Sequence, residues 1–482
     1  MSLNKENTKI FPKALPLKQL IGPSFLILAL GLGSGEIILW PYLVANYGLG
    51  IAWGALLGIS FQYFINMEIE RYALVKGESV FVGLRRLFPW APAWFIISTF
   101  IGFGLPGMAA ASAQIVAKLL GWGDFKLLAI AFLILIGLIL SVGKSVYQRM
   151  EKITQVIILI GVPFIMLIAI LVVKWSDVGA LMNGLVGRGD GYFGLPAGIG
   201  LATFLAAFAY SGAGGNLNLT QSIYIKEKGY GMGKYAGKMG GLFHSVDRAN
   251  RSVKLSGQAF AQTPENLANF KQWWKRVSLE HAIVFWLTGF LTICLLMLVA
   301  YATAFGLSGN AKGIMFVLNE GLFISNNLLP IFGSAFLLAL GVMLFQTQLG
   351  VCDSTSRIMS ENMAVLDMNN KGEVKADLSK IYFIFVWLQV SFGSLLFFLN
   401  YYEPKTLLIL GAVINAVAMF VHIGLVYRLN IKTLPIDYRP ARWRRVLIIG
   451  IFIFFGVFSA ITLKTEAINY WENTVKLMIT GK

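Results

Sequence analysis

The chain contains apolar runs that are each long enough to cross a lipid bilayer as a helix. A crossing needs about 20 mainly apolar residues, and about eleven such runs are present. They cover residues 20–45, 49–70, 92–120, 126–143, 153–173, 196–224, 277–305, 328–356, 380–400, 405–427 and 446–464. Because 57% of the residues are hydrophobic and only 13% are charged, a soluble core could not bury this surface. The sequence therefore predicts an all-α, multi-pass integral membrane protein.

The formal net charge of +17 follows from membrane topology. If the N-terminus is cytoplasmic, eleven spans place 31 of the 40 lysines and arginines in connections on the cytoplasmic side. This distribution is the positive-inside bias of membrane proteins. It predicts a bacterial inner-membrane location with the C-terminus outside, and the bilayer rather than nucleic acid as the partner of the basic residues.

Two of the spans contain glycine-rich, polar stretches near their middle. The first span contains "GLGSGEIILWP" from Gly31 to Pro41, and the sixth contains "SGAGGNLN" from Ser211 to Asn218. A helix that breaks inside a bilayer leaves peptide groups unpaired, so a break persists only where it faces protein, water or a ligand. Glycines also allow close helix packing. Two clusters at matching positions, each beside polar side chains, favour discontinuous helices and an inverted-repeat transporter.

The matching positions divide the chain into two halves of five helices and one added helix. We expect an N-terminal segment at 1–19, a first repeat at 20–174, an extracellular connection at 175–195, a second repeat at 196–428, and an eleventh helix with a C-terminal tail at 429–482. The second repeat carries a basic, Gly-rich cytoplasmic insertion at 225–276. This insertion could gate a pore, contact anionic lipid or be a loosely ordered linker, which is the interpretation we favour.

Several stretches of the chain resemble the Nramp family of divalent-metal transporters. They are "IGPSFLILALGLGSGEIILWPYLVANYGLGIAWGALLG", "FQYFINMEIERYALVKGES", "QRMEKITQVIILIGVPFIMLIAI" and "AFLLALGVMLFQTQ". The resemblance covers most of the chain and has the same eleven-span plan. It implies a LeuT-like fold of the APC superfamily, with the substrate held between spans one and six, no cofactor, and function as a monomer.

The metal-binding motifs of the family do not carry over. The family's Asp-Pro-Gly-Asn is replaced by Gly33, Ser34, Gly35 and Glu36, so the aspartate is missing and a glutamate stands in the asparagine position. The family's Met-Pro-His in the sixth span becomes Ala213 to Gly215. The acidic residues that the family is thought to use for proton movement are also absent from the third span. Without thioether and imidazole, oxygen donors favour a hard ion such as magnesium or manganese, and the family includes a branch reported to carry magnesium.

The expected substrate site combines oxygen donors from the two breaks with one amide from the eighth span. Its residues are Gly33, Ser34, Gly35, Glu36, Ala213, Gly214, Asn216, Asn218 and Gln346. Glu36 and Asn216 are the candidate metal ligands. A charged group at bilayer depth costs about 2.5 to 3.5 kcal/mol, whereas a carboxylate at the start of a half-helix is stabilised by about 0.3 to 1 kcal/mol. This comparison favours a functional Glu36, while Asn216 could instead cap the second half of its span.

The eighth span supplies candidates for a coupling ion. Asp353, Ser354 and Thr355 lie toward its cytoplasmic end, where they could hold sodium or a proton. Asp353 could instead pair with Arg357 one turn later. Glu68 and Glu70 are expected in the headgroup zone beside Arg71.

Two further residues in the spans are titratable. His281 and His422 are expected to be buried, hydrogen-bonded core residues. No metal-ligand spacing links these two histidines to each other.

Two functions remain open at this point. The first is a carrier of a divalent cation that uses Glu36 and oxygen donors. The second is an ion-coupled symporter of a small organic solute such as an amino acid or amine, whose carboxylate could lie at the half-helix N-termini. A membrane-embedded enzyme is a distant third, because the spans contain no nucleophile–base pair.

Overall fold

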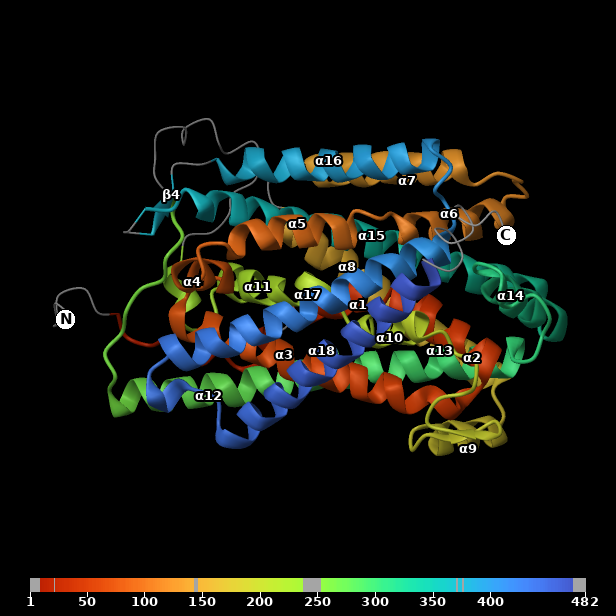
Figure 1. Cartoon of the computed structure of the whole chain (residues 1–482), viewed down its shortest axis with the longest axis horizontal. Helices are drawn as coiled ribbons and strands as arrows, with labels where there is room; N and C mark the ends of the chain where they lie inside the picture. Colours follow the sequence, from red (N-terminus) through yellow and green to blue (C-terminus); the bar gives the residue numbers. More distant parts are fainter. Residues whose placement is uncertain are drawn as a thin grey trace.

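The computed structural model describes residues 9–20, 22–142, 146–236, 253–369, 372–374 and 377–470. Parts of the expected N-terminal segment, insertion and C-terminal tail, at 1–8, 237–252 and 471–482, lie outside the described residues. The described residues form a bundle of helices that run roughly along the long axis of the molecule (Figure 1).

The helices coincide with the apolar runs of the sequence. Within the described residues, nine helical stretches are long and apolar enough to cross a membrane. They are formed by α1 (Pro23–Gly31) with α2 (Trp40–Tyr47), α3 (Ala52–Lys76), α5 (Ala91–Phe103) with α6 (Gly107–Leu119), α8 (Val146–Val172), α12 (Pro264–His281) with α13 (Thr288–Ala304), α15 (Pro330–Leu366), α16 (Leu378–Phe398), α17 (Pro404–Thr433) and α18 (Arg442–Tyr470). The two other expected spans are the shorter α7 (Lys126–Ser141) and the pair α10 (Leu201–Ala209) and α11 (Thr220–Lys228).

The first span is broken near its middle, as its glycines predict. α1 ends at Gly31, and after two intervening residues the chain forms a π-helical turn, η3 (Ser34–Leu39), which leads into α2. In the most apolar part of this span, 94% of the residues are buried inside the protein. In the corresponding parts of α8 and α18, only 28% of the residues are buried. The broken helix is therefore surrounded by protein, as a break at bilayer depth requires, and α8 and α18 face outward.

The sixth span is broken in the same way. α10 ends at Ala209, and the 3-10 turn η5 (Gly215–Leu219) precedes α11. Gly214 and Gly215 have φ angles of +72° and +51°, in the left-handed region that side chains with a Cβ rarely adopt. The glycines of this stretch are therefore needed for the conformation of the break.

The third span, expected to be continuous over 92–120, is also interrupted. α5 ends at Phe103 and α6 begins at Gly107, with Gly104, Leu105 and Pro106 between them. Proline lacks the amide hydrogen that would continue the hydrogen bonds of the helix. Pro106 in "FGLPG" is therefore the sequence feature that marks this interruption.

The insertion at 225–276 is more structured than a loosely ordered linker. α11 continues to Lys228, and α12 begins at Pro264, so the basic "FKQWWKR" stretch is helical. Thr263 caps α12, since its side chain accepts a hydrogen bond from the amide of Asn266. Through the π-helical turn η8 (Ala282–Leu287), α12 leads into α13. The linker interpretation is therefore wrong for the described ends of this segment.

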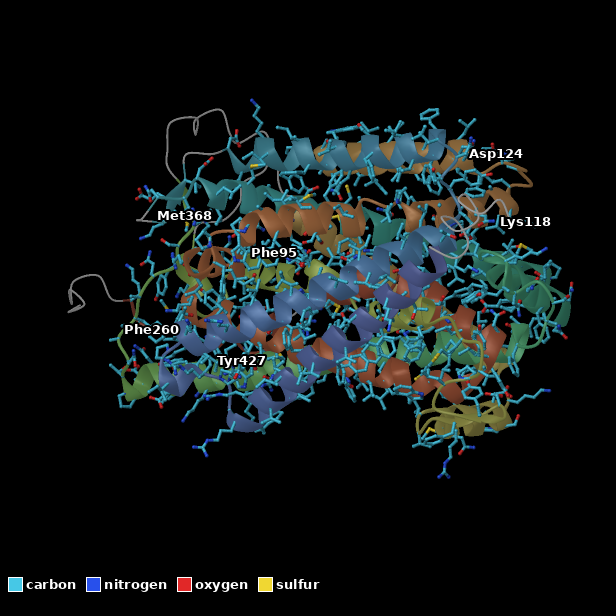
Figure 2. All side chains as sticks on the ribbon, in the orientation of Figure 1. Phe95, Lys118, Asp124, Phe260, Met368 and Tyr427 are labelled. Atoms are coloured by element: carbon cyan, nitrogen blue, oxygen red, sulfur yellow. The ribbon has the colours of Figure 1, made fainter. Side chains whose placement is uncertain are left out.

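Short elements cover both ends of the bundle. One end carries α9 (Trp175–Gly184), the hairpin of β1 (Arg188–Gly189) and β2 (Tyr192–Phe193), and α14 (Met315–Asn327), while the other carries α4 (Val80–Leu87) and the pair β3 (Val253–Lys254) and β4 (Glu373–Val374). Figure 2 places Lys118 and Asp124 at the first end, and Phe260 and Met368 at the second. The second end carries the connections that the sequence assigns to the cytoplasm.

Candidate functional site

The two helix breaks lie against each other in the core of the bundle. A Cβ atom built on Gly35 would overlap the backbone carbonyl oxygen of Tyr210, and one built on Gly31 would lie 2.9 Å from the Cα of Gly212. The glycines thus serve close approach as well as interruption. The sequence left close helix packing and broken helices as alternative roles for these glycines, and the structure contains both.

Gln62 of α3 partners the open backbone groups of the sixth span. Its Nε2 donates to the carbonyl oxygen of Ala209 at 2.8 Å, and its Oε1 accepts from the amide of Gly214 at 2.9 Å. Because Gln62 is wholly buried, water does not compete for these bonds. Gln62 is not among the residues predicted for the site, although a polar glutamine in the middle of a membrane span indicates a buried hydrogen-bonding role.

Thr347 of α15 performs the corresponding role for the first span. Its hydroxyl lies 2.9 Å from the carbonyl oxygen of Leu32 and 3.4 Å from that of Ala29, as well as 3.0 Å from that of Met343 in its own helix. The carbonyl oxygen of Gly33 accepts from the amide of Ile37 at 2.8 Å. This carbonyl therefore already accepts one hydrogen bond, and a carbonyl oxygen has a second lone pair; its role as a cation ligand stays a prediction.

Replacing Gln62 with leucine should destabilise the sixth-span break. The substitution leaves the Ala209 carbonyl and the Gly214 amide buried without partners, and each such group costs about 1 to 3 kcal/mol. We expect a lower melting temperature for the purified protein in detergent. Gln114→Leu in α6 is the matched control, because the side-chain oxygen of Gln114 has no hydrogen-bond partner. Equal melting temperatures for the two variants would contradict the role of Gln62.

Glu36 lies in the π-helical turn of the first span and is wholly buried. Neither of its carboxyl oxygens has a hydrogen-bond partner among the described residues. One of them, Oε1, lies 3.6 Å from the position that a Cβ on Gly289 of α13 would occupy. A buried carboxylate without a partner is unfavourable unless it holds a proton or a cation. At the first-span break, Glu36 is therefore the group that a proton or a cation would stabilise.

The amide nitrogens of two other expected ligands bond to helices other than α13. The side-chain nitrogen of Asn216 donates to Ser98 at 2.8 Å and to Thr99 at 3.0 Å, both in α5, whereas Glu36 faces α13. Gln346 donates to Thr154 of α8 at 3.1 Å. The arrangement therefore brings the two breaks together while the expected donor side chains point to different neighbours.

Two asparagines lie close to the sixth-span break. Asn218 is wholly buried, and neither its side-chain nitrogen nor its side-chain oxygen has a hydrogen-bond partner. Asn415 of α17 donates to the carbonyl oxygen of Gly102 at 2.9 Å and to the hydroxyl of Tyr210 at 2.8 Å. A Cβ on Gly215 would overlap the side chain of Asn415, so α17 forms one wall of this break.

The coupling-ion candidates of α15 are buried and already have partners. Asp353 accepts from Arg357 at 3.0 Å and from the Tyr382 hydroxyl at 2.6 Å. The Ser354 hydroxyl is 2.7 Å from that of Tyr224, and Thr355 donates to Gln389 at 2.7 Å. The ion pair with Arg357, which the sequence left as an alternative, is present, and a coupling-ion role for these residues stays a prediction.

Glu68 and Glu70, expected beside Arg71 at the inner end of the second span, are buried within the bundle. Their position in the headgroup zone stays a prediction. Glu68 accepts hydrogen bonds from Arg71 and from Arg444 of α18, at 2.9 and 2.8 Å. Glu70 contacts α11 and α12, because these helices close over the inner end of α3.

The two histidines differ from each other. His281 is buried, and its Nδ1 lies 2.8 Å from the hydroxyl of Ser24. His422 is buried, but neither ring nitrogen has a hydrogen-bond partner among the described residues. The expectation of a hydrogen-bonded core histidine is therefore wrong for His422.

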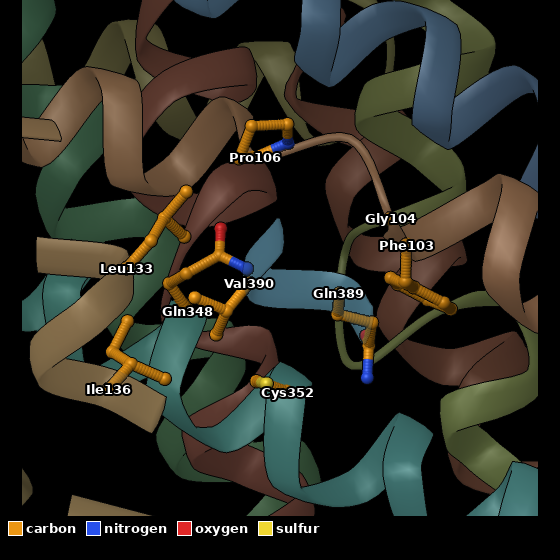
Figure 3. Close-up of a pocket in the computed structure, with 9 residues that line it drawn as sticks. All are labelled: Phe103, Gly104, Pro106, Leu133, Ile136, Gln348, Cys352, Gln389 and Val390. Atoms are coloured by element: carbon orange, nitrogen blue, oxygen red, sulfur yellow. The ribbon is translucent and has the colours of Figure 1, made fainter. Parts of the chain in front are cut away.

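The interruption of the third span borders a small cavity (Figure 3). Its wall combines residues of the interruption with side chains of α7, α15 and α16. Gln348 and Gln389 are the polar side chains of this wall. The Oε1 of Gln348 accepts from the amide of Ala109 at 3.3 Å, so the cavity wall also stabilises the first turn of α6.

Comparison with known proteins identifies the fold. No protein-family model matches the chain, and no curated protein matches it in sequence. Two solved structures of a manganese transporter from Eremococcus coleocola, one a mutant and one in complex with an aromatic bis-isothiourea substituted compound, are each 12% identical to the chain. Each alignment covers 98% of this chain and 93% of the other, with TM-scores of 0.69 for the mutant and 0.66 for the complex.

A second kind of transporter shares the architecture. Mhp1, a nucleobase-cation-symport-1 family transporter with bromovinylhydantoin bound, is 13% identical over 96% of both chains with a TM-score of 0.50. These likenesses confirm the LeuT-like inverted repeat with an added helix, and they confirm the Nramp resemblance at the level of the fold. The chain is a multi-pass membrane protein with a transporter fold.

Proposed function

We propose that this protein carries a hard divalent cation, such as magnesium or manganese, across the membrane through a site at the two helix breaks. The observation that carries the proposal is Glu36, a wholly buried carboxyl group beside the broken backbone that has no hydrogen-bond partner in the described part of the chain. An intramembrane ionisable residue in such a position is a functional candidate. A cation that reaches Glu36 would satisfy the charge that the protein leaves unpaired.

The donor chemistry around the breaks supports a hard ion. The proposed ligand set consists of Glu36 and Asn216, with oxygens near Gly33, Ala213 and Asn218 as further donors. Magnesium needs only one or two carboxylates because it keeps several of its waters. The Asn216 amide nitrogen is bonded to α5, while its side-chain oxygen, the atom that would bind the ion, has no hydrogen-bond partner among the described residues.

The fold neighbours support the same proposal. The Eremococcus coleocola proteins are manganese transporters and align with almost the whole of this chain. Their cargo is a property of those proteins, and at 12% identity it does not transfer by itself. Together with Glu36, however, it favours a metal ion over an organic solute.

The competing function is symport of a small organic solute, as in Mhp1 with its bound hydantoin. Such a cargo would need the aromatic side chains near the breaks. Trp40 and Phe204 instead pack edge to face at 5.9 Å, and the Trp40 indole donates to Ser211 at 2.9 Å. Because these aromatic side chains pack on each other, they do not line a site for an organic solute in this structure. We therefore favour transport of a cation.

Uptake by proteoliposomes separates the two functions. The purified full chain should move magnesium or manganese down a concentration gradient, as reported by an ion-sensitive dye trapped inside the vesicles. Metal-independent uptake of a radiolabelled amino acid or amine, without cation movement, would overturn the proposal. We further propose that the protein acts as a monomer in a bacterial inner membrane, with its N-terminus in the cytoplasm.

A further inference from the structure

Four helices meet at a cluster of buried polar side chains on the inner side of the first-span break. The cluster consists of Ser24 of α1, Glu70 of α3, Gln221 of α11, and Glu280 and His281 of α12. None of these five residues is more than 7% exposed. We call them the inner cluster. It lies at the end of α3 opposite to the hairpin of β1 and β2.

Hydrogen bonds connect the members of the inner cluster. The Ser24 hydroxyl donates to Oε2 of Glu280 at 2.5 Å and lies 2.8 Å from Nδ1 of His281. The same Nδ1 lies 3.4 Å from Oε1 of Glu70, which accepts from Nε2 of Gln221 at 2.5 Å. Within the described residues, three atoms of the cluster have no hydrogen-bond partner: the second oxygens of Glu70 and Glu280, and Nε2 of His281.

This geometry links the position of the Ser24 hydrogen to the protonation of Glu280 and His281. A serine hydroxyl has a single hydrogen, so if Ser24 donates it to Glu280, the contact with His281 requires a hydrogen on Nδ1. The result is a continuous chain from His281 through Ser24 to Glu280, with Glu70 beside its start. A proton can therefore be bound or released by a connected unit of two carboxyl groups and one imidazole.

Basic side chains do not neutralise the inner cluster. Within the described part of the chain, neither Glu70 nor Glu280 forms an ion pair with a lysine or arginine. On α3 and α18, Arg71 and Arg444 are bound to Glu68, and on α11, Lys226 is bound to Glu361. Two carboxylates in this dry environment would therefore be unfavourable unless the cluster also holds protons.

The remaining charged groups near the cluster are also engaged. On α11, Lys228 is bound to Glu151 of α8 at 2.7 Å, and this pair flanks Gly22 at the start of α1. On α12, Arg276 donates to the carbonyl oxygens of Ala14 and Leu15. The faces of α1, α3, α11 and α12 that surround the cluster therefore supply no free counter-charge from these residues.

The inner cluster is joined to the broken helix through Ser24. α1 has only nine residues and ends at Gly31, beside the break. Ser24 lies in its first turn and bonds α1 to α12. A change in the cluster can thus reach the break through one short, rigid half-helix.

We propose that Glu70, Glu280 and His281, linked through Ser24, form the proton-binding site that couples protons to cation transport. The bound proton keeps α1 packed against α3 and α12. When the proton leaves for water, two carboxylates remain without a counter-charge, and they become hydrated as α1 moves away. This inference rests on the proposed function, because coupling presupposes a transported cation.

The first test measures α1 without any cargo. Hydrogen exchange of residues 23–31 in nanodiscs should become about tenfold faster as the pH rises through the titration of the cluster, after correction for the intrinsic pH effect; this corresponds to about 1.4 kcal/mol. The double variant Glu70→Gln with Glu280→Gln should show no such pH dependence. Glu320→Gln, which changes a buried acid of α14, is the control that keeps it. The inference would be overturned if hydrogen exchange in the wild type did not depend on pH, or if exchange in the double variant still depended on pH.

The second test measures coupling in proteoliposomes. An imposed pH gradient should change the rate of manganese uptake by the wild type several-fold, and the double variant should lose this response. A double variant that still responds to the gradient contradicts the proton site while leaving cation transport intact. A wild type that moves no cation contradicts the proposed function, and the exchange experiment then decides on the proton site by itself.

Discussion

Glu36→Gln is expected to abolish cation uptake. Glutamine has nearly the same shape as glutamate, so the substitution removes the negative charge at the break and little else. Breaking a buried charge pair costs about 3 to 5 kcal/mol, and every 1.4 kcal/mol is about a factor of ten in an equilibrium constant. Magnesium or manganese uptake by proteoliposomes should therefore fall about 100-fold or more.

Stability measurements distinguish this loss from misfolding. Both oxygens of Glu36 lack partners in the structure, so the ion-free glutamine variant should melt no lower than the wild type. A ligand that binds only the folded state raises its stability, and manganese should raise the melting temperature of the wild type but not of Glu36→Gln. The control is Glu320→Gln, which also neutralises a buried acid but should keep both uptake and the manganese effect. Normal uptake by Glu36→Gln would contradict the proposed site.

Much of the fold could be predicted because membrane burial imposes simple sequence patterns. Apolar runs of sufficient length marked the spans, and the glycine clusters marked the breaks at Gly31 and Gly214. The interruption at Pro106 was missed because the apolar run continues through it, so that hydropathy alone shows one span. The helical start of α12 was missed for the opposite reason: its first turns are polar and basic, and hydropathy does not detect them.

The candidate site was less predictable, because partners depend on contacts between distant segments. Glu36 could be identified from its depth in a span alone. The roles of Gln62 and Thr347 could not, since they depend on which backbone groups of other helices lie opposite them. The contacts of Glu70 could not be predicted either, because its partners Gln221 and His281 come from the distant helices α11 and α12.

Gly35→Ala is expected to disrupt the contact between the two breaks. The added Cβ would overlap the carbonyl oxygen of Tyr210, which is backbone and cannot move aside as a flexible side chain would. The turn containing Glu36 would have to separate from the end of α10, and overpacking of this kind costs about 1 to 3 kcal/mol. Because the same turn positions Glu36, we expect a lower melting temperature together with the loss of cation uptake.

Gly450→Ala provides the matched control for this substitution. Gly450 lies in α18, and a Cβ at this position meets no atom within 4 Å. In a helix, alanine is favoured over glycine by about 1 kcal/mol, so this variant should melt at the wild-type temperature or above and should transport normally. If Gly35→Ala behaved in the same way, the two breaks could not be in the close contact described here. Transport would then have to be explained without a direct contact between the breaks of the first and sixth spans.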